Sequence, residues 1–237
     1  MSVKKRIFVL IPVYIAVLSI LLLIGIGTNR GVKAFNETKE NTNRKAVIID
    51  AGHGDPDGGA TSCSGKLESE INLEIALRLN DLMHFLGIKT VMTRSTCESV
   101  YTQGNTIGAK KISDLKNRVK LVNSVEDGIL VSIHQNYFQE GKYSGAQVFY
   151  NNLPRSKEMA TMLQDAFVST LNPGSKRRPK RGEGIYLLDN VKSASVLIEC
   201  GFLSNPEEDI LLQDKTYQLK ICSIIATCLS SCINAAN

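Results

Sequence analysis

Residues 46–54 read AVIIDAGHG, a short apolar run that leads into a histidine between two glycines. Apolar runs of this length that end in turn residues are typical of buried strands. In residues 68–86, apolar side chains recur every three or four positions, and Gly87 follows. That spacing predicts a helix with one buried face and a glycine at its end. A buried strand followed by such a helix is a unit of α/β proteins.

The same alternation continues to the end of the chain, without an internal repeat. We expect further strands at residues 90–93, 129–133, 145–150, 185–188 and 195–198. We expect further helices at residues 113–123, 156–171 and 217–233. The pattern predicts a single α/β domain over residues 45–237, with an open, mostly parallel or mixed sheet and helices on both faces.

The first 45 residues differ in composition from the rest. Three positive residues at positions 4–6 precede the uncharged stretch 7–26, which as a helix would cover about 30 Å, the thickness of a bilayer core. We therefore expect residues 1–27 to form an N-terminal hydrophobic helix, either a membrane anchor or a cleaved signal segment, and residues 28–44 a polar linker. The positive residues predict that the following domain is exported across the cytoplasmic membrane, where it is anchored or secreted to the cell wall.

Charge and cysteine content exclude some classes of protein. The chain carries a net charge of +5, but residues 1–45 hold eight basic and two acidic residues, so the domain itself is near neutral at about -1. A near-neutral domain without tryptophan does not favour a nucleic-acid partner. The six cysteines are scattered and show no CxxC spacing, so we expect free thiols rather than a disulfide framework.

Polar side chains follow three of the predicted strands. His53, His134 and Glu199 come directly after the runs at 46–50, 129–133 and 195–198 or within a few residues of them. The carboxyl ends of parallel strands form the edge where ligands bind in open α/β sheets. Two histidines and one carboxylate are an established ligand set for catalytic zinc. Glu68 and Glu70, at the start of the first helix, are both candidates for the carboxylate.

Each candidate also has a structural explanation. His53 lies in a glycine-rich turn, and His134 can be a polar strand end. His84 lies on the polar side of the first helix, and we expect it at the surface. Glu199 directly follows an apolar strand, where burial of a carboxylate is costly unless it meets a cation, a metal or hydrogen bonds. The residues alone predict a hydrolytic metal site.

Four ordered segments carry a more specific signal. They are IDAGHGDPDGGA (49–60), ESEINLEIALRL (68–79), SIHQN (132–136) and VLIECGFLSNPEED (196–209). In order and spacing they resemble the zinc-dependent N-acetylmuramoyl-L-alanine amidases of the Amidase_3 type, over residues 45–233. The resemblance implies a Zn²⁺ ion held by His53, Glu68 and His134, with Glu199 as the catalytic acid and base. Departures at Asp55, Gly58, Ala194 and Cys200 leave these positions intact and affect only the expected loop geometry.

The resemblance also implies a substrate. Members of this family hydrolyse the amide bond between N-acetylmuramic acid and L-alanine in peptidoglycan. The segments SGAQVFY (144–150), KRRPKR (176–181) and GEGIYLLDNV (182–191) are similar to the germination-specific amidases, which act on spore cortex in muramic-δ-lactam formation.

Two alternatives remain open. One is a zinc-binding cell-wall protein whose weak activity depends on an activator protein, and the other is a zinc peptidase that cuts within the stem peptide. The basic run at 176–181 is either a solvated loop or a contact for stem-peptide carboxylates or an acidic partner.

Overall fold

The computed structural model describes residues 46–234. The expected hydrophobic helix at 1–27 and linker at 28–44 lie outside the described residues. Within these residues, six strands form one sheet in the order β2-β1-β3-β6-β4-β5. Their bounds are β1 Val47–Ala51, β2 Thr90–Met92, β3 Ile129–Asn136, β4 Gln147–Tyr150, β5 Lys180–Arg181 and β6 Ala194–Phe202. Every pairing is parallel except that of β4 with β6. The predicted mixed sheet is confirmed.

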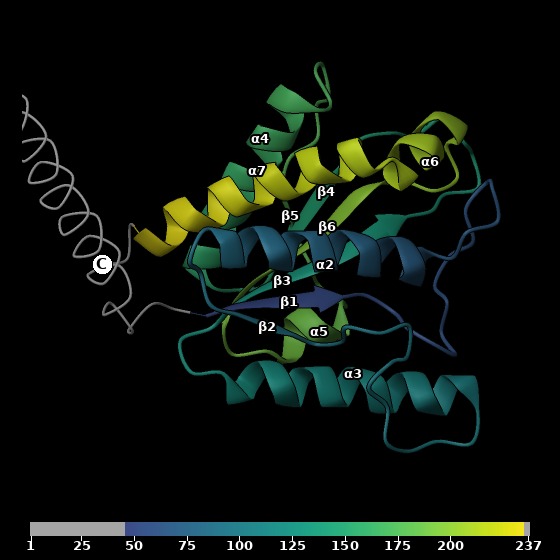
Figure 1. The fold of residues 1–237 in the computed structure, drawn as a ribbon, viewed down its shortest axis with the longest axis vertical. Coiled ribbons are helices and arrows are strands. Elements are labelled where there is room, and N and C mark those ends of the chain that lie inside the picture. The colour runs from purple at the N-terminus through teal and green to yellow at the C-terminus, as the bar shows by residue number, and fades with distance from the viewer. Residues whose placement is uncertain (1–45, 235–237) are drawn as a thin grey trace, which may run out of the picture. The chain divides into compact units, whose positions relative to one another are not determined.

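Helices cover both faces of this sheet, as predicted (Figure 1). On one side lie α2 (Glu68–Phe85), α4 (Pro154–Thr170), α6 (Pro206–Gln213) and α7 (Lys215–Asn234). On the other lie α3 (Ile107–Ser124) and α5 (Tyr186–Asn190). The domain is therefore a three-layer arrangement, with the sheet in the middle.

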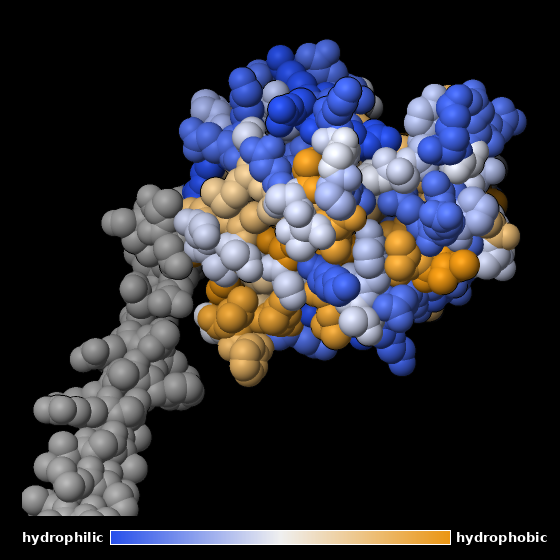
Figure 2. Space-filling view, turned by 90° about the horizontal axis from the view of Figure 1, so that it is seen from above, coloured by the Kyte–Doolittle hydropathy of each residue, from blue (hydrophilic) through white to orange (hydrophobic). Residues whose placement is uncertain are grey.

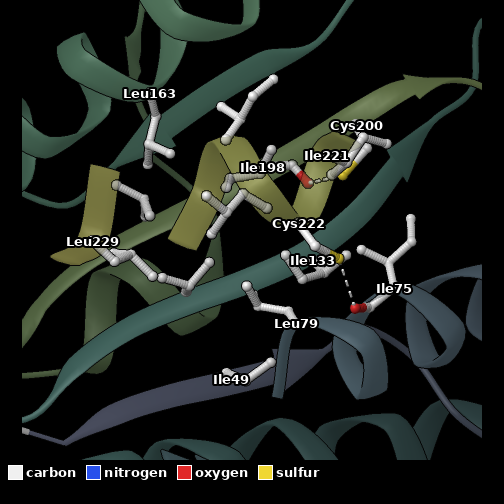
Figure 3. Packing of buried hydrophobic residues seen from close by; sticks show 14 of the residues in the cluster. Ile49, Ile75, Leu79, Ile133, Leu163, Ile198, Cys200, Ile221, Cys222 and Leu229 are labelled. Carbon is white, nitrogen blue, oxygen red and sulfur yellow. Dashed lines mark hydrogen bonds between the residues drawn. The ribbon is translucent and has the colours of Figure 1, made fainter. Parts of the chain in front are cut away.

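The larger core lies between the sheet and the helices α2, α4 and α7. Ile49, Ile133 and Ile198 come from three adjacent strands and are fully buried there, as Figure 3 shows. Cys222 of α7 donates its thiol to the carbonyl of Ile75 on α2, with a sulfur to oxygen distance of 3.5 Å. All six cysteines are free thiols, and the buried ones pack as small apolar side chains.

Helix α7 is rich in apolar residues. Residues Lys215–Ile233 are long and apolar enough to cross a membrane. Within the domain, however, this helix packs against α2 and α4 and contributes Ile221, Ile225 and Leu229 to the core. We interpret it as a core helix. Apolar residues also remain exposed on α6 and α7, among them Ile210. Figure 2 looks onto the side of the domain that carries these helices and shows hydrophobic patches among hydrophilic residues.

One predicted strand is wrong. Residues 185–188 were expected to be extended, but Tyr186–Asn190 form the short helix α5. Gly184, at φ +81°, turns the chain, and its amide donates to the carboxylate of Asp189 at 2.9 Å. Leu187 and Leu188, adjacent in sequence, are both buried. A four-residue apolar run does not distinguish a buried strand from a buried helical turn.

Several boundaries also differ from those predicted. Helix α3 begins at Ile107 rather than at residue 113, because the hydroxyl of Thr106 caps it by accepting from the amide of Ala109 at 3.2 Å. The strands β3 and β6 continue past the predicted ends, so His134 and Glu199 lie within strands, not after them. Helix α6 and the two-residue strand β5 were not predicted from the sequence.

Candidate metal centre

Three of the predicted site residues come together at one place. His53 follows β1, Glu68 is the first residue of α2, and His134 lies on β3. Each offers one donor atom, and these atoms lie within 4.8 Å of one another. Glu68 Oε1 is 3.3 Å from His53 Nε2 and 3.0 Å from His134 Nδ1. Two imidazoles and one carboxylate in this arrangement suit a divalent transition metal.

The structure distinguishes the two candidate carboxylates. Glu68 is buried, and its oxygens accept from the amides of Ala60 at 3.0 Å and Gln135 at 3.2 Å. These bonds fix the direction of the carboxylate. Glu70 is exposed, and its side chain accepts from the amide of Leu67 at the start of α2 at 3.1 Å. Glu70 therefore caps a helix, while Glu68 joins the cluster. His84 is exposed on α2, as predicted.

The turn after β1 explains the glycines around His53. His53 itself has φ +60°, a left-handed conformation that residues with a side chain adopt at a cost. The backbone at Gly52 contacts the ring of His134, so a Cβ atom at position 52 would lie 2.2 Å from His134 Nε2. Only glycine allows the backbone and the imidazole to approach so closely.

Two carboxylates make the cluster strongly attractive to a cation. Burial alone would lower the pKa of His53, but its hydrogen bonds to Asp57 and Glu68 raise it to about 9. Burial would likewise raise the pKa of Glu68, but the two histidines hold it well below its usual range. Protons and metal ions compete for such donors. The chemistry of the donor set thus fits a bound divalent cation.

Glu199 lies beside this cluster. It is the register partner of His134 across the β3 and β6 pair. Its Oε2 atom is buried and has no hydrogen-bond partner within residues 46–234. Burial raises the pKa of Glu199 to about 7, and the charge of Glu68 adds to this effect while the histidines oppose it. A buried carboxyl oxygen without a partner is uncommon, and with this pKa it can take up or release a proton near neutral pH.

Two buried arginines, which the sequence analysis missed, hold the turn that carries His53. Arg94 donates to the carbonyls of Ala51 and Gly52, both at 2.9 Å. Arg118 donates to the carbonyls of Ala51 at 2.7 Å and His53 at 2.5 Å. One signal was available in the sequence. Arg118 lies four residues before Val122, so it shares a helix face with an apolar residue, and the structure shows that Val122 is buried.

A cavity of about 290 Å³ opens beside the cluster, between α3 and α5. His53, His134 and Lys111 line it together with apolar side chains of the α5 segment, including Ile185 and Leu187. A mostly apolar cavity with a few convergent polar groups is the usual form of a small-ligand site.

The basic run at 176–181 lies elsewhere, since none of its residues lines this cavity. Arg177 stacks over the Phe202 ring at 4.9 Å and donates to the Ser144 carbonyl at 3.1 Å. Residues Lys180–Arg181 form the exposed edge strand β5. Part of the run therefore has a structural role.

Comparisons with known proteins agree with this geometry. The family model described as N-acetylmuramoyl-L-alanine amidase (Amidase_3) matches residues 47–231. The chain is 40% identical over 184 residues to the germination-specific N-acetylmuramoyl-L-alanine amidase of Bacillus subtilis, covering 76% of each protein. It is also 28% identical to the amidase LytC of the same organism, although it covers only 38% of that protein.

Solved structures give the same result. The CwlD amidase from Clostridioides difficile, in complex with the GerS lipoprotein, superposes with a TM-score of 0.77 at 38% identity, over 81% of this chain and 99% of that chain. An N-acetylmuramoyl-L-alanine amidase from Clostridium difficile 630 superposes with a TM-score of 0.71 at 28% identity, over 82% of this chain and 100% of that one.

Proposed function

This chain belongs to the N-acetylmuramoyl-L-alanine amidase family, and we propose that its cluster of His53, Glu68 and His134 holds a zinc ion for hydrolysis of the amide between N-acetylmuramic acid and L-alanine in peptidoglycan. The observation that carries the proposal is the position of Glu199. Its buried Oε2 atom has no hydrogen-bond partner within residues 46–234 and stands beside the three convergent donors of the cluster.

The donor set supports zinc in particular. Two imidazole nitrogens and one carboxylate oxygen are three protein ligands, which leave one position open in a tetrahedral site. When bound, the zinc ion would polarise the scissile carbonyl as a Lewis acid and lower the pKa of water in the site.

Glu199 supplies the proton transfers of the reaction. Its Oε2 would take a proton from the attacking water, whose oxygen bonds to the lactyl carbonyl carbon. As the carbon to nitrogen bond breaks, the same carboxyl would give that proton to the departing amine of L-alanine. Burial of Glu199 favours its protonated form, so the carboxyl can hold the proton between the two steps.

The remaining residues orient these groups. The carbonyls of the turn after β1 are held by Arg94 and Arg118, which keeps the His53 ring facing Glu68. The cavity between α3 and α5 provides an apolar wall that would exclude bulk water from one side of the reacting amide.

The biological substrate we propose is spore cortex peptidoglycan, in muramic-δ-lactam formation. The support is the 40% identity to a germination-specific amidase.

A relative of known structure forms a complex with a lipoprotein, so we propose that an accessory protein also acts with this chain. We further propose that residues 1–27 export the domain, either as a membrane anchor or as a cleaved signal.

The decisive experiment compares Glu199→Gln with the wild-type protein on purified peptidoglycan. Mass spectrometry of the products identifies the bond that is broken. We expect the wild type to release intact stem peptides that begin with L-alanine, and the variant to retain zinc while losing turnover by at least about 100-fold. Glu126→Gln, at an exposed position near the other end of β3, is the matched control and should keep full activity.

Two results would contradict the proposal. Products cut within the stem peptide would identify a zinc peptidase instead, and near wild-type release by Glu199→Gln would remove its assigned role. Elemental analysis tests the ligand set separately, because His53→Ala should lose bound zinc. Full zinc occupancy in that variant would show that the ligands are other residues.

A further inference from the structure

We propose that Asp57 is a positioning residue that holds the His53 ring so that its Nε2 atom, not its Nδ1 atom, faces the metal. This inference rests on the metal site of the proposed function. Its basis is a chain of contacts that runs from α3 through Asp57 to His53.

The contact between the two side chains is short and direct. His53 Nδ1 lies 2.9 Å from Asp57 Oδ2. A carboxylate only accepts hydrogen bonds, so Nδ1 must carry the proton and donate. The lone pair of the neutral ring is then on Nε2, the atom that faces Glu68 Oε1 at 3.3 Å. His134 differs, because its Nδ1 atom faces the same oxygen at 3.0 Å.

Asp57 is itself held in place. Its amide donates to the Gly54 carbonyl and its carbonyl accepts from the Gly54 amide, both at 2.9 Å, which closes a four-residue loop directly after His53. Its Oδ1 accepts from the Gly59 amide at 3.3 Å. The carboxylate is thus fixed at one oxygen by the backbone and offers the other to the imidazole.

Lys111 of α3 completes the arrangement. Its Nζ lies 2.9 Å from the same Oδ2 atom of Asp57, and its side chain is 46% exposed. The ammonium of Lys111 and the imidazole of His53 thus both contact Oδ2 of Asp57, so this oxygen has two hydrogen-bond donors. Because Lys111 is at the surface, water can replace it at little cost.

Carboxylates that accept from a metal-bound histidine fix its tautomer and raise its basicity, and their loss usually weakens metal binding 10- to 100-fold. We therefore expect Asp57→Ala to raise the dissociation constant for zinc by about 10- to 100-fold. Asp57→Asn keeps the volume and an acceptor oxygen, so its loss should be smaller. Lys111→Met should remain within about threefold of the wild type.

The test measures zinc affinity by competition with a chromophoric chelator and records the absorption spectrum of the cobalt(II)-substituted protein. We expect the spectrum to change in Asp57→Ala, since the donor geometry changes. Melting curves of the metal-free proteins separate metal binding from folding. Asp55→Asn, at an exposed position in the same loop, is the matched control and should bind zinc as the wild type does.

Wild-type zinc affinity in both Asp57 variants would overturn the inference. It would also be overturned if Lys111→Met lost as much affinity as Asp57→Ala, because charge balance would then be the cause. His53→Ala provides the reference for the site as a whole. If that variant kept wild-type affinity, the proposed metal site would be wrong; if it lost zinc while the Asp57 variants did not, only the positioning role would fail.

Discussion

Replacing Arg118 by methionine should destabilise the domain more than any surface change on the same helix. The guanidinium is buried, with Nη1 2.6 Å from Asp50 Oδ1 and Nε 2.7 Å from Asp114 Oδ2. Both carboxylates are also buried. Methionine fills a similar volume but leaves two carboxylates without their cation.

The expected magnitude follows from this burial. Removing one partner of a buried ion pair costs about 3–5 kcal/mol, because the remaining charge is left without compensation. Arg118 also donates to the carbonyls of Ala51 and His53, and buried acceptors without donors add to the cost. We therefore expect the free energy of unfolding to fall by at least about 3 kcal/mol.

Urea denaturation followed by circular dichroism measures this quantity, with metal removed from both proteins. Lys120→Met is the matched control, since it deletes a positive charge at an exposed position of α3 and should change stability by less than about 0.5 kcal/mol. An Arg118→Met protein within about 1 kcal/mol of the wild type would show that the network does not stabilise the fold.

The same network predicts a pH dependence. Burial alone would raise the pKa of Asp50, but Arg118 and the hydroxyls of Ser132 and Thr93 lower it from 3.8 to about 2. A carboxyl with a lowered pKa contributes stability that is complete above pH 3.8 and is lost as the pH falls through 2. The difference corresponds to about 2 kcal/mol. In Asp50→Asn this acid-induced loss should be absent from unfolding curves measured between pH 5 and 2.

Three further predictions concern the site and its surroundings. Gly52→Ala should weaken zinc binding at least tenfold in a chelator competition, because the new methyl group would lie 2.2 Å from His134 Nε2. Glu208→Ala should lower the free energy of unfolding by about 1–3 kcal/mol in urea titrations, since its buried carboxylate accepts from the Phe202 amide at 2.8 Å. Arg178→Glu should leave the melting temperature within about 2 °C of the wild type, because its ion pair with α4 is exposed and 3.5 Å long.

The periodic segments of the sequence were predicted well, for a physical reason. Helix α2 and strand β1 each bury one continuous set of apolar side chains, so their spacing carries the signal. The segment at 185–188 failed because an apolar run of four residues covers barely one helical turn and so shows no periodicity. The two-residue strand β5 has exposed side chains on both residues and therefore leaves no hydrophobic pattern.

The residues of the site were likewise predicted only where a sequence pattern marks them. Motif resemblance selected Glu68 over Glu70, and the structure brings Glu68 into the cluster. The supporting residues were missed because their partners are distant in sequence or are backbone atoms. Lys111 reaches Asp57 across 54 positions. Arg118 donates to backbone carbonyls, which every residue has, so the sequence does not mark these acceptors. Such contacts depend on the three-dimensional arrangement of α3 against the turn.

The order of the strands constrains how this domain folds. β6 is the last strand within residues 46–234, yet it lies between β3 and β4 near the middle of the sheet. Pairings between segments so far apart form slowly, because a long loop must close first. Residues 53–134, which contain all three candidate metal donors, are synthesised before residues 194–202. Thus the three candidate metal donors are synthesised well before Glu199, and the cluster gains its neighbouring carboxyl only once β6 has been inserted between β3 and β4.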